Sequence, residues 1–172
     1  MEVQGRIIKL FGEINEEMAF AVWSALRFFE GQSRGPIVIV INSAGGNVVD
    51  MFAIIDAIAS SSCPIATIGT GIVASAATGI LVSGTPGNRY LTPHCSVMLH
   101  EMSMGDYGKL TDLQAAMAEG RRKQRMYEDH MISSTGIPLE ILRKHMAGPD
   151  KWMSATTAVR LRLADQILRD LI

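Results

Sequence analysis

Ser75 is the residue whose surroundings most favour covalent chemistry. It lies within residues 71–79, and its direct neighbours are alanines. Small neighbours leave room for a carbonyl group to approach the hydroxyl, and the next backbone amide can face the negative charge that develops on the carbonyl oxygen. A serine among small residues also lets helices pack closely, and the G-x-S-x-G motif is absent. The spacing alone leaves both a nucleophile and a packing residue open.

A serine nucleophile needs a base with a pKa near neutrality, and histidine is the usual one. His100 follows an apolar stretch, residues 97–99, and is placed to project from a strand end into a cleft. His130 and His145 lie in polar helical patterns and are expected at the surface. A carboxylate must then orient the imidazole. The sequence offers several and does not choose among them: Asp106, Asp112, Asp150 and Asp165.

Residues 42–46, Asn-Ser-Ala-Gly-Gly, lie between a β-branched run and a helical pattern. Paired glycines allow a sharp turn and expose amide hydrogens where the helix dipole favours negative charge. Such a turn can hold an oxyanion, although an ordinary strand-to-helix connection has the same composition. Neither phosphate-loop pattern is present.

The elements that must position these residues alternate between strand and helix, which is typical of an α/β fold of βαβ units. The predicted strands are 5–11 (ended by Gly12), 37–41, 64–68 (followed by a turn at 69–71), 90–91 and 96–99. The predicted helices are 17–30, 48–59, 73–82, 110–131, 138–145 and a short one capped by Ser154. No repeat or linker interrupts the pattern, so residues 1–172 are expected to form one domain.

Two helices have surfaces that the single chain does not explain in full. Residues 18–23 are apolar all round, so this helix is expected to be deeply internal or covered by a partner subunit. The long helix 110–131 carries the polar run 121–125, Arg-Arg-Lys-Gln-Arg, which is expected to form a solvated face.

The composition excludes several classes of protein. With 16 Lys plus Arg against 17 Asp plus Glu, the chain has no basic field to bind nucleic acid. Its two cysteines, Cys63 and Cys95, lack metal-ligand spacing and are expected to be buried hydrophobic residues in a reducing cytoplasm. The start of the chain does not resemble a signal peptide. The uncharged stretch 65–82 is long enough to cross a membrane, but its glycines, serines and threonines favour a buried strand, turn and helix.

Four segments together resemble the proteolytic subunit of the ATP-dependent Clp protease (the ClpP family). They are residues 41–46 (Ile-Asn-Ser-Ala-Gly-Gly), 71–79 around Ser75, 96–100 (Ser-Val-Met-Leu-His) and 150–155 (Asp-Lys-Trp-Met-Ser-Ala). They occur in the family's order and with its spacing, and the likeness covers nearly the whole chain. The resemblance implies a ClpP/crotonase-like fold of repeated βαβ units with a protruding handle helix.

The resemblance also implies a serine endopeptidase. Ser75 would be the nucleophile, His100 the general base and then acid, and Asp150 the orienting carboxylate. The amides of Gly46 and Ala76 would form the oxyanion hole, and the chemistry would need no cofactor. Residues 102–108 would pair with an extended substrate, and the helix 110–131 would stack two seven-membered rings of a homo-oligomer face to face. Unfolded polypeptides would enter the closed chamber with the help of a partner AAA+ unfoldase or another Clp subunit.

The chain departs from the family pattern at several places. Ala44 and Met102 stand where proline is usual, Ala76 where methionine is usual, and Pro149 where an arginine commonly helps to couple the rings. A backbone amide donor survives each change near the nucleophile, so the chemistry is expected to persist in a pocket of different shape. The chain also opens almost at the first strand, which implies a short form without the family's N-terminal axial segment, from a phage or a cell.

Three alternatives use the same residues differently. The first is a catalytically silent ring subunit, although the residues at 75, 100 and 150 are all retained. The second is a crotonase-like acyl-CoA enzyme, which would hold a thioester enolate on the glycine-rich amides and leave the Ser75 and His100 spacing unexplained. The third is a phage capsid-maturation peptidase, which differs in substrate rather than in mechanism.

Overall fold

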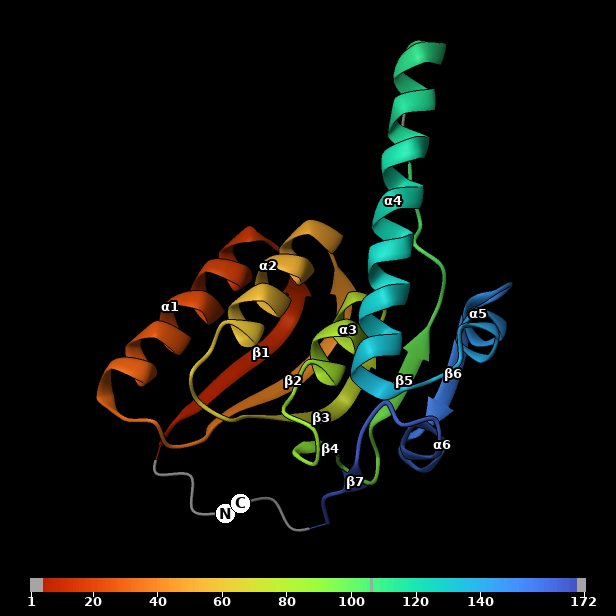
Figure 1. Ribbon diagram of the computed structural model, residues 1–172. Coiled ribbons are helices and arrows are strands. Elements are labelled where there is room, and N and C mark those ends of the chain that lie inside the picture. Colours follow the sequence, from red (N-terminus) through yellow and green to blue (C-terminus); the bar gives the residue numbers. More distant parts are fainter. Residues whose placement is uncertain (1–4, 106, 170–172) are drawn as a thin grey trace.

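Figure 1 shows the computed structural model, which describes residues 5–105 and 107–169. These residues form a seven-stranded sheet. Its main path runs through five parallel strands: β1 (Ile7–Ile14), β2 (Ile37–Gly46), β3 (Ile65–Ala74), β4 (Arg89–Leu91) and β7 (Gln166–Ile167). β5 (Ser96–Leu99) pairs in parallel with the end of β3, and β6 (Lys151–Ser154) pairs antiparallel with β5. The predicted α/β class is confirmed.

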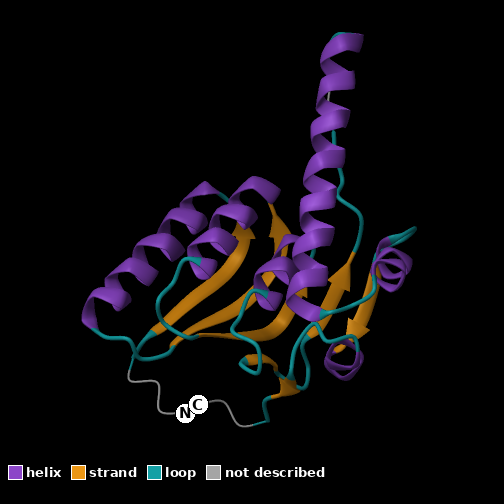
Figure 2. Ribbon diagram, in the orientation of Figure 1, coloured by secondary structure: helices purple, strands orange, loops and turns teal. Residues whose placement is uncertain are grey.

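Six helices connect or follow these strands in the described residues, and Figures 1 and 2 show how they are arranged. Three of them alternate with β1, β2 and β3: α1 (Glu16–Gln32), α2 (Val48–Ala59) and α3 (Ala76–Val82). The C-terminal part contributes α4 (Leu110–Thr135), α5 (Leu139–Met146) and α6 (Ala155–Arg160). The side chain of Asn15 caps α1 by accepting from the Met18 amide, and Asn47 caps α2 in the same way. These caps explain why both helices begin within one residue of their predicted start.

Three glycine-containing segments that were predicted to end strands lie inside them instead. β1 continues through Gly12, β2 through Gly46, and β3 through the predicted turn at residues 69–71. Gly12 and Gly71 have φ values of +95° and +60°, which glycine adopts without strain, and the pairing register shifts at these places rather than stopping. The strands are therefore longer than their apolar runs and carry the backbone to the edge where the site lies.

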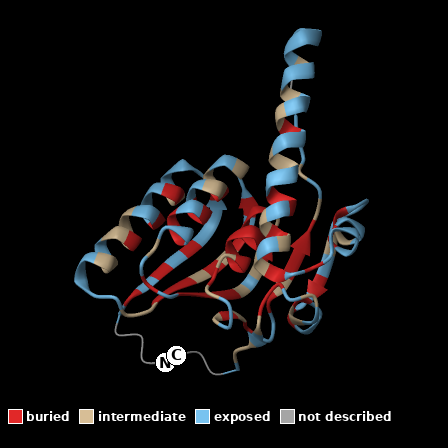
Figure 3. Ribbon diagram, viewed as in Figure 1, coloured by how far each residue is buried: buried red, intermediate tan, exposed pale blue. Residues whose placement is uncertain are grey.

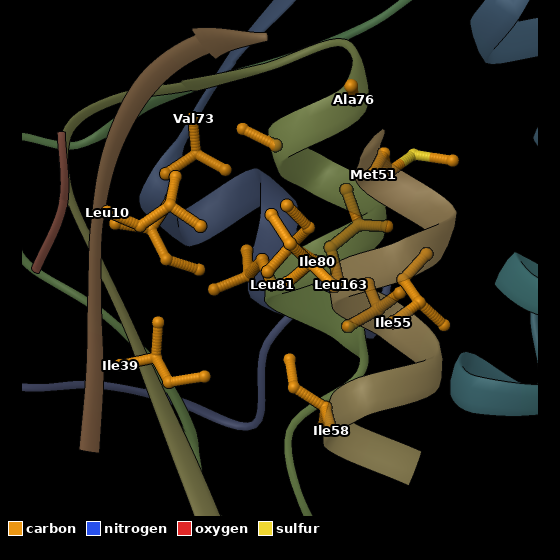
Figure 4. Packing of buried hydrophobic residues seen from close by; sticks show 14 of the residues in the cluster. Leu10, Ile39, Met51, Ile55, Ile58, Val73, Ala76, Ile80, Leu81 and Leu163 are labelled. Atoms are coloured by element: carbon orange, nitrogen blue, oxygen red, sulfur yellow. The ribbon is translucent and has the colours of Figure 1, made fainter. Parts of the chain in front are cut away.

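The hydrophobic core lies between the sheet and the helices that cover one of its faces. Figure 4 shows Leu10 and Ile39 of the sheet facing Ile58, Ile80 and Leu81 of the helices. A second, smaller cluster, which includes Val38, Ala66 and Ile68, covers the opposite face. Burial on both faces explains why residues 37–41 are apolar without alternation. Cys63 and Cys95 are buried free thiols, as predicted.

α1 presents two apolar faces. Its inner face is buried through Ala19, Val22 and Leu26. Its outer face exposes two aromatic side chains, Phe20 by 70% and Phe28 by 64%. In the single chain this helix is not deeply internal, so coverage by a partner subunit stays a prediction.

α4 projects from the body of the molecule (Figure 1), and Figure 3 shows its far end largely exposed. It continues four residues beyond its predicted end, to Thr135, and stops where Gly136 adopts a left-handed conformation with φ +68°. Among the described residues no helix has the length and apolarity that crossing a membrane requires.

Candidate active site

Ser75 occupies the turn between the end of β3 and the start of α3. Its φ of 54° and ψ of −124° are strained for a residue with a side chain. The Ser75 amide donates to the Met98 carbonyl, and the Thr78 amide donates to the Ser75 carbonyl, so both backbone groups are held. This is the geometry of a nucleophile elbow, in which a sharp strand-to-helix turn presents the hydroxyl. The sequence prediction placed the helix start at residue 73 and therefore missed the elbow.

His100 follows directly after β5, and its Nε2 lies 2.7 Å from the Ser75 hydroxyl oxygen. The parallel pairing of Ala74 with Met98 fixes the two strand ends side by side, so the backbone sets this distance. A histidine nitrogen in hydrogen-bond contact with a serine hydroxyl is the arrangement that activates a nucleophile.

Asp150 precedes β6, and its Oδ1 lies 3.5 Å from His100 Nδ1. The antiparallel pairing of Leu99 with Lys151 brings the two residues together. The contact is long for a hydrogen bond, and the Asp150 side chain is 54% exposed. The carboxylate is therefore near the imidazole but not locked onto it.

Among the other candidate carboxylates, Asp165 pairs with an arginine instead. Asp165 forms a two-pronged ion pair with Arg89, with Oδ1 at 2.6 Å from Nη2 and Oδ2 at 3.0 Å from Nε. Burial alone would raise the pKa of Asp165, but the Arg89 guanidinium and the amides of Arg89 and Gly87 hold it below its ordinary value. Asp112 is exposed in the first turn of α4, and Asp106 lies outside the described residues.

His130 is half-buried rather than exposed, although its polar surroundings predicted a surface residue. Its Nε2 lies 3.0 Å from the Gly79 carbonyl oxygen and 3.1 Å from the Ser83 hydroxyl. Because a carbonyl only accepts, Nε2 carries the proton and cannot act as a base toward Ser83. Burial lowers the pKa of His130, so the ring is neutral at neutral pH. Its role is to join α4 to α3.

The glycine pair predicted to form an anion-binding turn lies directly against Ser75. A Cβ added to Gly45, whose φ is +105°, would stand 2.7 Å from the Ser75 Cβ and 3.2 Å from the Ala76 nitrogen. Gly46 and Ala76 both line the cleft beside Ser75. Ala76 is also the first residue of α3, where the helix leaves amide hydrogens without an intrahelical acceptor. The structure therefore brings together the five residues Gly46, Ser75, Ala76, His100 and Asp150.

A cleft of about 460 Å³ opens over Ser75 and His100. Its walls come from the start of α2, from residues 102–104 and from α4, and they include Val48, Met102, Met104, Lys123 and Tyr127. The sequence reasoning missed the part played by α4, because the helical pattern there is mainly polar. Within residues 5–105 and 107–169, no group of three or more His, Cys, Asp or Glu side chains is arranged to hold a metal ion.

A serine on a strained turn lies against a histidine, and the histidine lies near an aspartate. This geometry is typical of serine hydrolases, whatever their sequence motif. Comparison with known proteins gives the family. The model of the Clp protease family matches residues 2–170. The chain is 35% identical over 164 residues to the ATP-dependent Clp protease proteolytic subunit of Porphyromonas gingivalis, with 95% of this chain and 73% of the relative covered. It is 36% identical over 158 residues to proteolytic subunit 1 of Chlamydia muridarum, with 90% and 82% covered.

The chain belongs to the Clp protease family and is a serine endopeptidase of the Clp type. The ClpP/crotonase-like fold implied by its sequence motifs is thereby confirmed, with α4 as the protruding helix.

Proposed function

We propose that Ser75 is the nucleophile of this peptidase, with His100 as general base and Asp150 as the carboxylate that orients the imidazole. The observation that carries the proposal is the 2.7 Å contact between His100 Nε2 and the Ser75 hydroxyl. His100 takes the hydroxyl proton as Ser75 attacks the peptide carbonyl, and returns it to the leaving amine. Water then hydrolyses the acyl-enzyme by the same proton transfers in reverse.

The amides of Gly46 and Ala76 hold the oxyanion of each tetrahedral intermediate. Both residues lie at the cleft beside Ser75, and the turn at Ser75 is braced by the Met98 carbonyl. Because backbone amides act here, the alanines at 44 and 76 leave the donors in place. The reaction as proposed requires no metal or organic cofactor.

The substrates are unfolded polypeptides, held as extended chains by main-chain hydrogen bonds along residues 102–108, of which residue 106 lies outside the described part of the chain. The subunits form a homo-oligomer, two stacked seven-membered rings, in which the sites line a closed chamber in the cytoplasm. A partner AAA+ unfoldase or another Clp subunit delivers the substrate. The exposed aromatic side chains Phe20 and Phe28 of α1 support a covering partner, since so much apolar surface is costly to leave in water.

Hydrolysis of a short fluorogenic peptide by the purified assembly tests the catalytic roles. Ser75→Ala and His100→Ala are expected to abolish turnover while the assembly stays intact. The matched control is Ser83→Ala, because Ser83 also contacts a histidine, at 3.1 Å, but lies outside the cleft. Near-normal turnover by Ser75→Ala would overturn the proposal, and a wild-type assembly without activity would favour a silent ring subunit.

A further inference from the structure

Gln124 lies in the polar run of α4 that was predicted to be a solvated face. Arg121, Arg122 and Arg125 are indeed exposed, but Gln124 is half-buried. Its Oε1 accepts a hydrogen bond of 3.0 Å from the backbone amide of Met102. Met102 lines the cleft and comes two residues after His100, so Gln124 holds the main chain next to the proposed base.

The other end of the Gln124 amide bonds to a buried carboxylate. Its Nε2 lies 3.4 Å from Oε1 of Glu128, one helical turn further along α4. The Glu128 side chain is only 8% exposed, and Arg143 of α5 donates to both of its oxygens, from Nε at 3.1 Å and from Nη2 at 2.8 Å. Arg143 holds the pKa of Glu128 below its ordinary value against the effect of burial, so the carboxylate stays ionised at neutral pH.

A second contact fixes the same stretch of cleft wall. The Met104 side chain packs directly on the backbone of Gly120, where a Cβ would collide with the thioether. Residues 102–104 are therefore held on α4 at two points, one polar and one apolar. On the other side, α5 is tied to the residue after Asp150, because Lys151 Nζ donates to the Lys144 carbonyl at 3.0 Å.

We propose that Gln124, Glu128 and Arg143 are positioning residues that align the catalytic centre from outside it. The network joins the cleft wall at Met102 to α5, and α5 leads to Asp150, so it fixes both flanks of His100. The inference rests on the proposed function, since it assigns these residues a task in the reaction at Ser75. None of the three touches the reacting atoms.

Gln124→Met removes the acceptor for the Met102 amide while keeping the length of the side chain. Met102 then loses the bond that fixes its backbone, and a displacement of about 1 Å near a reacting centre costs up to about a hundredfold in rate. We expect kcat and the rate of Ser75 modification by a fluorophosphonate to fall together, by at least about tenfold. The fluorophosphonate rate reports alignment of Ser75 and His100 without peptide binding.

Arg143→Met breaks the network at its far end and is expected to lower both rates less, by about threefold to tenfold, since Gln124 remains. If the network acts as one unit, the double variant is no slower than Gln124→Met alone. The control is Asp129→Asn, which neutralises an exposed carboxylate next to Glu128 in the same helix. It should match the wild type, and all variants should keep the wild-type assembly and a similar Tm.

Three results separate the possibilities. Fluorophosphonate rates of Gln124→Met within twofold of the wild type, or losses that follow a fall in Tm or in assembly, would overturn the positioning role. Losses that multiply in the double variant would overturn the link from α5 to the cleft. A wild-type assembly that the fluorophosphonate does not label at Ser75 would overturn the proposed function itself.

Discussion

Asp150→Asn tests the part of the proposed triad that the geometry holds least firmly. The carboxylate lies 3.5 Å from His100 Nδ1. At that separation a carboxylate attracts an imidazolium by about 1.2 kcal/mol at the dielectric of water and by about 4.7 kcal/mol at an effective dielectric of about 20. The 54% exposure of Asp150 places the environment between these limits. Losing about 2 to 3 kcal/mol of transition-state stabilisation lowers kcat by about 30- to 150-fold.

This loss is smaller than the roughly 10⁴-fold loss that follows the same change at a buried triad aspartate. The assay is kcat for a fluorogenic peptide, measured on variants whose assembly has been checked. Asp165→Asn is the matched control, because the Asp165 carboxylate is paired with Arg89. This variant should keep kcat within about twofold of the wild-type value. A loss of less than threefold for Asp150→Asn, or a larger loss for a folded Asp165→Asn, would show that Asp150 is not the carboxylate that orients His100.

Three further predictions concern the turn, acid stability and assembly. Gly45→Ala forces a Cβ into a left-handed backbone position 2.7 Å from the Ser75 Cβ. We expect the unfolding free energy to fall by about 1 to 3 kcal/mol and kcat to fall at least tenfold, and unchanged values would contradict this prediction. Because the pKa of Asp165 is lowered in the folded state, its ion pair stabilises the fold fully above the unfolded-state pKa and less as pH falls through the folded-state pKa. The Tm of the wild type should therefore exceed that of Asp165→Asn by a margin that shrinks between about pH 5 and pH 3, and a constant difference in Tm would contradict this. Trp23→Glu, on the half-exposed outer side of α1, should shift the assembly toward monomers in light scattering; a monomeric wild type would rule out the predicted interface.

The fold follows from the sequence where local signals are strong. α2 has its predicted bounds because Asn47 caps it and an apolar face continues to Ala59. β5 was also predicted with its observed ends. β6 and β7 were not predicted, because they are four and two residues long and exist only through pairing with strands far away in the chain.

The candidate site could be predicted from the sequence less completely than the fold, because its geometry is set by tertiary contacts. Spacing alone left Ser75 ambiguous, since the elbow depends on where β3 ends and not on a G-x-S-x-G motif. Four aspartates were open on sequence, and the resemblance selected Asp150, which the pairing of β6 with β5 places beside His100. The contribution of α4 to the cleft was missed because lining residues such as Glu119 and Lys123 look like part of a solvated helical face.

Site mapping of a fluorophosphonate adduct shows directly whether Ser75 is the nucleophile. The wild-type assembly is treated with the reagent and digested, and the modified residue is located by mass spectrometry, with Ser75→Ala and Ser83→Ala treated in parallel. We predict a single adduct on Ser75 in wild type and in Ser83→Ala, and none in Ser75→Ala. An adduct on another serine, or an intact wild-type assembly without any adduct, would mean that Ser75 is not the activated nucleophile.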